Sequence, residues 1–239
     1  MLNVDMTIRR IVADDYRAAA VFERHGIDFC CGGDRPVGDA CREKGVDAGQ
    51  VAAELEAALA SAGDQPRFGA WDLDFLAAFI VNNHHAYVRQ AAAPMQAHTR
   101  KVAEVHGARH PEVREIADRF DLVAADLLAH MAKEERMLFP YISRLAEAAR
   151  GGEAPEAPFG TVANPIRMME LEHRNAGDQM AAIRRLSGGF VPPGDACATF
   201  RVTLQELQAF EADLHRHVHL ENNILFPRAL DLERRLRRG

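Results

Sequence analysis

Two stretches of the chain share one pattern, in which a histidine precedes a glutamate by four residues. One contains His130 and Glu134, the other contains His217 and Glu221, and both continue to Leu-Phe-Pro. Residues four apart lie on one face of an α-helix, one turn from each other. An imidazole nitrogen and a carboxylate oxygen placed in this way can bind one metal ion. Two such stretches therefore predict a dinuclear metal site in a helical bundle, with carboxylates free to bridge the ions.

A further histidine precedes each stretch at a similar distance. An alignment of the two halves places an apolar residue one turn before each of them, Ile80 before His84 and Met169 before His173. This alignment selects His84 over its neighbour His85. The predicted ligands are four imidazoles and two carboxylates: His84, His130, Glu134, His173, His217 and Glu221.

The donor set limits the choice of metal. It holds no thiolate cluster, which argues against a structural zinc site, and too few oxygens for a calcium or magnesium cage. Imidazole suits iron, copper, nickel or zinc. The set is richer in imidazole than ferritin-like di-iron sites, which favours binding of small neutral ligands over iron storage. A single His-x-x-x-Glu would be weak support, because such pairs also occur as ordinary surface contacts. Four other histidines are interpreted as ordinary surface or satisfied residues: His25, His98, His110 and His215.

The second chemical feature is the pair Cys30 and Cys31, which two glycines follow. Adjacent cysteines form a strained ring if they bond to each other, so two thiols on a turn are expected. Two interpretations stay open from the sequence alone. The thiols are accessible and bind metal, exchange disulfides or become nitrosylated, or they are small buried residues. Cys41 and Cys197 are expected to be packed inside the protein.

The segments that must position these residues are helical. Periodic apolar patterns separated by Gly- and Pro-rich loops predict four long helices, at about 72–106, 111–149, 164–186 and 195–235. Their short connections predict an all-α, up-and-down four-helix bundle over residues 70–239.

A smaller unit precedes the bundle. Residues 1–62 predict a small helical domain, with one helix over 12–24 and another that Asp47 caps. A turn-rich linker is expected at 61–69. The N-terminal unit contains few apolar residues, so we expect it to be weakly stable alone.

Composition excludes some classes of protein. The 239 residues are 48% hydrophobic and carry a formal net charge of −6, which argues against nucleic acid or an anionic membrane as the main partner. We find neither an apolar signal core at the N-terminus nor an apolar run long enough to span a bilayer. The sequence predicts a soluble, cytoplasmic protein whose cysteines are thiols.

Together these motifs resemble the repair-of-iron-centres family of the ScdA/YtfE type, which are hemerythrin-like di-iron proteins. The resemblance covers nearly the whole chain. It is carried by DFCCGG at 28–33, HMAKEERMLFP at 130–140, MMELEHRNAG at 168–177 and HVHLENNILFP at 217–227.

The resemblance implies a non-haem centre of two iron ions, oxo-bridged, with Glu134 and Glu221 bridging and two histidines on each iron. It also implies a functional role for Cys30 and Cys31, and places His106 near the site without making it a ligand. The implied function is repair of iron–sulfur clusters damaged by nitrosative and oxidative stress, through iron release or nitric oxide binding. A nitric oxide scavenger and a di-iron nitric oxide reductase are the alternatives. The expected partners are damaged iron–sulfur proteins and nitric oxide or oxygen, while a homodimer is left open.

Overall fold

The computed structural model describes residues 2–60 and 66–238, and the regular elements in these ranges are helices. This confirms the predicted fold class. Part of the predicted linker, residues 61–65, lies outside the described residues, and Phe68–Ala70 form a short 3-10 helix, η1. Within the described ranges, no helix has the length and apolar character needed to cross a membrane.

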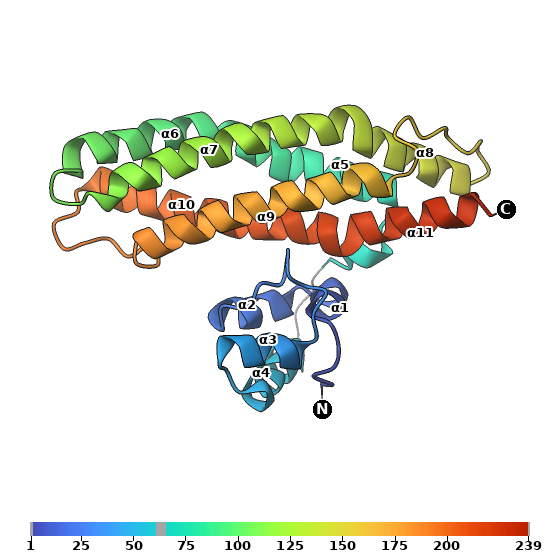
Figure 1. Cartoon of the computed structure of the whole chain (residues 1–239), viewed down its shortest axis with the longest axis horizontal. Coiled ribbons are helices and arrows are strands. Elements are labelled where there is room, and N and C mark those ends of the chain that lie inside the picture. Colours follow the sequence, from blue (N-terminus) through green and yellow to red (C-terminus); the bar gives the residue numbers. More distant parts are fainter. Residues whose placement is uncertain (1, 61–65, 239) are drawn as a thin grey trace.

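Four long helices lie side by side as the predicted hemerythrin-like bundle (Figure 1). Three of them are interrupted by a short π-helical turn. In chain order they are α5 (Leu73–Ile80), η2 (Val81–His85) and α6 (Ala86–His106); α7 (Glu112–Lys133), η3 (Glu134–Leu138) and α8 (Phe139–Ala149); α9 (Ala163–Leu186); and α10 (Ala198–His219), η4 (Leu220–Leu225) and α11 (Phe226–Leu236).

The π-turns explain how two of these helices continue past a proline. Proline lacks the backbone N–H that a regular helix needs at its interior positions. Pro140 and Pro227 both fall in the first turn of a new α-helical segment, directly after η3 and η4. The wider π-turn, closed by bonds five residues apart, changes the hydrogen-bond pattern where the proline enters. The Leu-Phe-Pro tails therefore lie where each π-turn next to a glutamate ends and the following α-helix begins.

The bundle core consists of two apolar clusters. One joins α6, α7, α10 and the second half of α9, and includes Met131 and Val218. The other joins α5, α8, α11 and the first half of α9, and includes Leu138 and Ile224. Glu134 lies between Met131 and Leu138 in the sequence, and Glu221 lies between Val218 and Ile224. The polar site therefore sits between two apolar halves that hold its helices in place.

The N-terminal unit has four short helices, α1 (Ile8–Asp14), α2 (Arg17–Arg24), α3 (Val37–Lys44) and α4 (Ala48–Ala60). The prediction of a single helix over 12–24 is wrong, because Asp15 adopts an extended backbone and ends α1. Its side chain then accepts the backbone N–H of Arg17 at 3.0 Å and starts α2. Asp47 caps α4 as predicted, accepting the N–H of Gln50 at 2.6 Å.

This unit packs against the side of the bundle next to η4 (Figure 1). Its buried residues, among them Phe22 and Phe29, belong to the same apolar cluster as α6, α7 and α10. The rings of Tyr16 and Phe29 contact His219, with centroids 5.0 and 6.2 Å away. Shared burial of this kind supplies stability that the unit's own small core would lack.

Candidate dinuclear metal site

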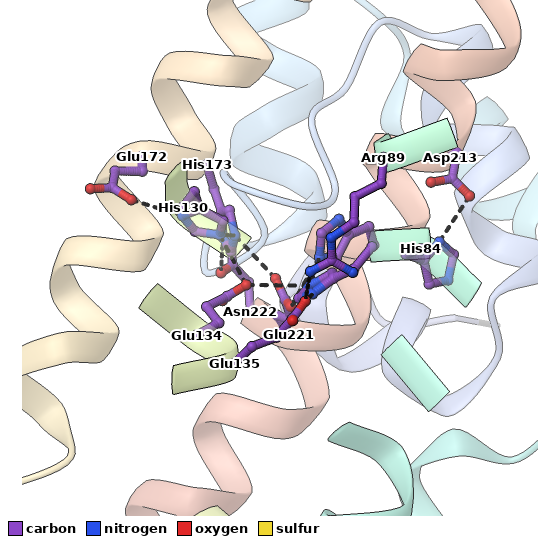
Figure 2. A network of polar contacts seen from close by, with 12 residues as sticks. His84, Arg89, His130, Glu134, Glu135, Glu172, His173, Asp213, Glu221 and Asn222 are labelled. Atoms are coloured by element: carbon purple, nitrogen blue, oxygen red, sulfur yellow. Dashed lines mark hydrogen bonds and ion pairs between the residues drawn. The ribbon is translucent and has the colours of Figure 1, made fainter. Parts of the chain in front are cut away.

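Two groups of four buried side chains meet in the centre of the bundle, and each group could hold one metal ion. The first contains His85, Glu134, His217 and Glu221, and the second contains His130, Glu134, His173 and Glu221. Within each group the candidate ligand atoms lie within 4.8 Å of one another. Both glutamates belong to both groups, which is the arrangement that two bridging carboxylates require. Figure 2 shows Glu134 and Glu221 pointing toward each other beneath His130 and His173.

The distances between ring nitrogens fit a shared cation. Nε2 of His85 lies 3.1 Å from Nε2 of His217, and Nε2 of His173 lies 2.9 Å from Nε2 of His130. Two nitrogens bound to one ion at about 2.1 Å, at a right angle, are about 3.0 Å apart. Each pair of histidines is thus spaced as two neighbouring ligands of a single ion.

The charges of the site also call for cations. Glu134 and Glu221 have no exposed surface, and three of their four carboxylate oxygens lack a hydrogen-bond donor among the described residues. Buried carboxylates of this kind are costly unless a positive charge compensates them. Burial opposes a charge on His85, but the two carboxylates outweigh it and raise its pKa to about 10. The same balance raises the pKa of His130 to about 9. Metal ions would compensate the same negative charge and displace the protons from His85 and His130.

Three of the four histidines are held through their other ring nitrogen. Nδ1 of His85 lies 2.6 Å from the carboxylate of Glu135, Nδ1 of His130 lies 2.8 Å from Glu172, and Nδ1 of His173 lies 2.9 Å from the side-chain oxygen of Asn222. Donation of the Nδ1 proton to these acceptors directs the Nε2 lone pair toward the centre, as metal-bound histidines need. Glu135 and Glu172 are themselves paired with cations on the surface, Arg89 and Lys133 respectively.

At one position the structure differs from the sequence prediction, because it brings His85 and not His84 into the cluster. Figure 2 shows His84 apart from the glutamates, with Nδ1 donating to Asp213 at 2.8 Å. The reason is η2. In a regular helix the residue four after the buried Ile80 would share its face, but a π-turn needs five residues to return to it. The alignment with α9, which contains no π-turn, therefore selected His84 and not the neighbour that lies in the cluster.

The other five predicted ligands all lie in the cluster, and the histidines outside it have different partners. His25, His98, His110 and His215 each contact acidic side chains away from the centre. His106 lies at the end of α6, 3.1 Å from the sulfur of Cys197, and contacts none of the clustered glutamates. The expectation that Cys197 is packed inside is wrong, since its side chain is exposed, whereas Cys41 is buried.

Sequence comparisons agree with this geometry. Residues 76–229 match the hemerythrin HHE cation binding domain, and residues 4–59 match the ScdA_N domain of unknown function. The iron–sulfur cluster repair protein YtfE of Musicola paradisiaca is 35% identical over 90% of this chain and 91% of its own length. Proteins of the same name from Yersinia pestis and Yersinia pseudotuberculosis are 33% identical over the same shares. The chain belongs to the YtfE family.

In this YtfE-family chain, the Cys-Cys loop is folded by its own aspartate. The Oδ1 atom of Asp28 accepts the backbone N–H groups of Cys30 and Cys31, both at 2.9 Å. Gly33 is needed for close approach, because a Cβ atom there would lie 2.9 Å from the carbonyl oxygen of Phe29. The motif Asp-Phe-Cys-Cys-Gly-Gly thus encodes a tight loop that presents two adjacent thiols.

The two thiols differ in environment. Cys30 is buried, and its hydrogen bond with Cys31, together with burial, raises the pKa of its thiol well above 9.0. Cys31 is half-buried, and both cysteines line a cavity of about 450 Å³ between the loop and the helices α9 and α10. The interpretation as two buried residues therefore fits Cys30, and the interpretation as an accessible thiol fits Cys31.

Sequence reasoning did not find the residues that orient the ligands. Glu135 and Glu172 directly neighbour motif residues, which is the one signal that pointed to them. Asn222 also follows a ligand, but its importance depends on the docking of the N-terminal unit, which no local pattern reports.

Proposed function

We propose that the chain holds two iron ions between His85 and His217 on one side and His130 and His173 on the other, with Glu134 and Glu221 bridging. The observation that carries this proposal is the pair of buried four-residue groups that share both glutamates. The mixed imidazole and carboxylate donors suit iron, and the family membership supports it. An oxo bridge between the irons completes the proposed centre.

We further propose that the protein repairs iron–sulfur clusters damaged by nitrosative and oxidative stress. The names of its relatives describe iron–sulfur cluster repair for those proteins. Bound iron supplies positions for a small ligand such as nitric oxide or oxygen and a store of metal for a damaged cluster. The bridging carboxylates of Glu134 and Glu221 control how firmly that metal is held, since each can bind through one or both oxygens. Damaged iron–sulfur proteins in the cytoplasm are the proposed partners.

The cysteines favour repair over a simple ligand carrier. A carrier of oxygen or nitric oxide needs the bundle alone, whereas here Cys31 lines a cavity where the N-terminal unit meets the bundle. We assign Cys31 to contact with the client protein or with the small ligand, and Cys30 to support of the loop.

The metal proposal is tested by replacing the bridging residues. The double variant Glu134→Ala and Glu221→Ala should lose both irons after reconstitution with ferrous iron under anaerobic conditions, measured as metal per chain. Glu135→Ala is the matched control, because Glu135 orients His85 without belonging to either group. This change should weaken metal binding by about 10- to 100-fold. Two irons per chain in the double variant would contradict the proposal.

The repair proposal is tested with a nitrosylated iron–sulfur enzyme. Iron-loaded protein should restore its activity, and the double glutamate variant should not. A nitrosyl adduct on the protein without restoration would favour a scavenger instead. Release of nitrous oxide from the reduced protein in a single turnover would favour a reductase.

A further inference from the structure

Asn222 connects the Cys-Cys loop to one of the candidate metal ligands. Its side chain is 3% exposed and lies between the two. Oδ1 is 2.9 Å from Nδ1 of His173, and Nδ2 is 3.2 Å from the carbonyl oxygen of Cys30. One buried amide therefore makes two hydrogen bonds, one to each feature. Figure 2 shows Asn222 directly beneath His173 and beside the glutamates.

The chemistry of the two partners fixes the direction of both hydrogen bonds. The carbonyl of Cys30 can only accept, so the NH₂ group of Asn222 must face it and the amide oxygen must face His173. His173 then donates from Nδ1 and keeps its lone pair on Nε2. That nitrogen lies 3.1 Å from Oε2 of Glu221, in the centre of the site. The position of the Cys-Cys loop thus sets the form of His173 that a metal ion requires.

His173 differs in this respect from the other oriented ligands. Glu135 and Glu172, which hold His85 and His130, are anchored by Arg89 and Lys133 on the bundle itself. Asn222 has no such charged anchor, and its second hydrogen bond goes to a loop of a different structural unit. Of the three orienting groups, Asn222 is the one through which movement of the N-terminal unit reaches the metal site.

The next residue provides a natural comparison. Nδ2 of Asn223 donates to the carbonyl of Phe29 at 2.9 Å, and Oδ1 of Asn223 accepts from Arg9 at 3.0 Å. Asn223 therefore also ties the loop to the bundle, and it is buried as well. Its third contact is with His219, which belongs to neither four-residue group. Asn222 and Asn223 hold adjacent carbonyls of the same loop, and of the two only Asn222 touches a candidate ligand.

We propose that Asn222 is a positioning residue that couples metal occupancy to the accessibility of the Cys-Cys loop. A metal ion on His173 holds its ring in place, which holds Asn222 and with it the Cys30 carbonyl. Loop opening breaks this hydrogen bond and releases the orientation of His173, so the ion on that side is held less firmly. Coupling between two sites is reciprocal, so metal binding closes the loop by the same factor as loop opening weakens metal binding. The inference rests on the proposed di-iron function.

The coupling is tested by measuring thiol alkylation and metal binding on the full-length protein. A small iodoacetamide reagent is applied to metal-free and ferrous-loaded protein, and the rate at each cysteine is followed by peptide mass spectrometry. The exposed Cys197 serves as the internal reference. In the wild type, metal should slow alkylation of Cys31 by roughly tenfold or more.

Three variants separate the coupling from simple loosening of the loop. Asn223→Ala should raise the metal-free rate at Cys31 but keep the slowing by metal. Asn222→Ala should raise the rate, lose the slowing, and bind one of the two ions about 10- to 100-fold more weakly. Asn222→Asp keeps an oxygen toward His173 but presents the other to the Cys30 carbonyl. It should lose the slowing with a smaller change in affinity, and it carries the test if Asn222→Ala does not fold.

The outcomes distinguish this inference from the proposed function. If the wild type binds two ions and metal slows alkylation equally in the wild type, Asn222→Ala and Asn222→Asp, the coupling is overturned while the di-iron proposal stands. If the wild type does not bind two ions, the result contradicts the proposed function, and with it the coupling that rests on that function.

Discussion

Replacement of His85 and His84, one at a time, gives the sharpest test of the site. The ring of His85 is fully buried, with Nε2 3.4 Å from Glu134 and 3.8 Å from Glu221. In the metal-free protein its raised pKa of about 10 keeps it charged at neutral pH, where it compensates both carboxylates. Removal of one partner from a buried ion pair costs about 3–5 kcal/mol. His85→Ala should therefore destabilise the metal-free protein by about that amount.

His84→Ala removes a different contact. His84 donates to Asp213 at the edge of the bundle, and the side chain of Asp213 is 25% exposed, so water can replace the lost donor. A hydrogen bond of this kind contributes about 0.5–1.5 kcal/mol. The variant should bind two ions. Loss of a hydrogen-bond partner of a ligand usually costs 10- to 100-fold in affinity, and because His84 only stacks on His217, we expect a loss of about tenfold, at the low end of that range.

The assays are urea unfolding of the metal-free proteins and iron per chain after anaerobic loading and dialysis. We expect a large loss of stability and loss of at least one iron for His85→Ala, and small changes for His84→Ala. Loss of an iron from His84→Ala together with two irons in His85→Ala would show that the repeat alignment, and not the π-turn, identifies the ligand.

Two further predictions concern stability. Burial opposes the charge on Glu233, but donation from Thr161 and Tyr141 outweighs it and lowers the pKa of the carboxyl below its usual 4.5. Its ionised form thus stabilises the fold above about pH 4.5. The difference in unfolding free energy between wild type and Glu233→Gln should therefore shrink as pH falls below that value. Denaturant titrations at several pH values measure this difference, and a constant difference would contradict the prediction. Gly33→Ala should lower the free energy of unfolding by about 1–3 kcal/mol and speed alkylation of the loop thiols, because the added Cβ meets a carbonyl oxygen at 2.9 Å. Gly194 has open space around it, so the control Gly194→Ala should change neither thermal unfolding nor alkylation.

Much of the site could be predicted because its rule is local. A spacing of four residues puts His130 over Glu134 and His217 over Glu221 whatever else the protein does, and the structure brings these four together. The bundle follows from the same kind of reasoning, since apolar periodicity and short loops leave few alternatives. The prediction of His173 as a ligand followed from the similarity of the two halves of the bundle.

The remainder depends on geometry that local patterns do not contain. The choice between His84 and His85 depends on one extra residue in a helical turn, and both residues satisfy the apolar pattern around them. The burial of Cys30 and the role of Asn222 depend on where the N-terminal unit docks, which involves contacts between residues almost two hundred positions apart. The break at Asp15 was visible in the residue type, but the apolar spacing across it masked the signal.

The three π-turns have a consequence for how the protein can be altered. Each inserts one residue into its helix, which rotates everything beyond it by about 100° relative to a regular helix. The apolar stripes of α5, α8 and α11 are therefore out of phase with those of α6, α7 and α10, and each half of the bundle is packed for its own phase. Deletion of a single residue from any one turn would make that helix regular, yet would swing one end of it out of its core. Truncations and chimeras of this protein must keep all three extra residues, or remove them together and repack one half.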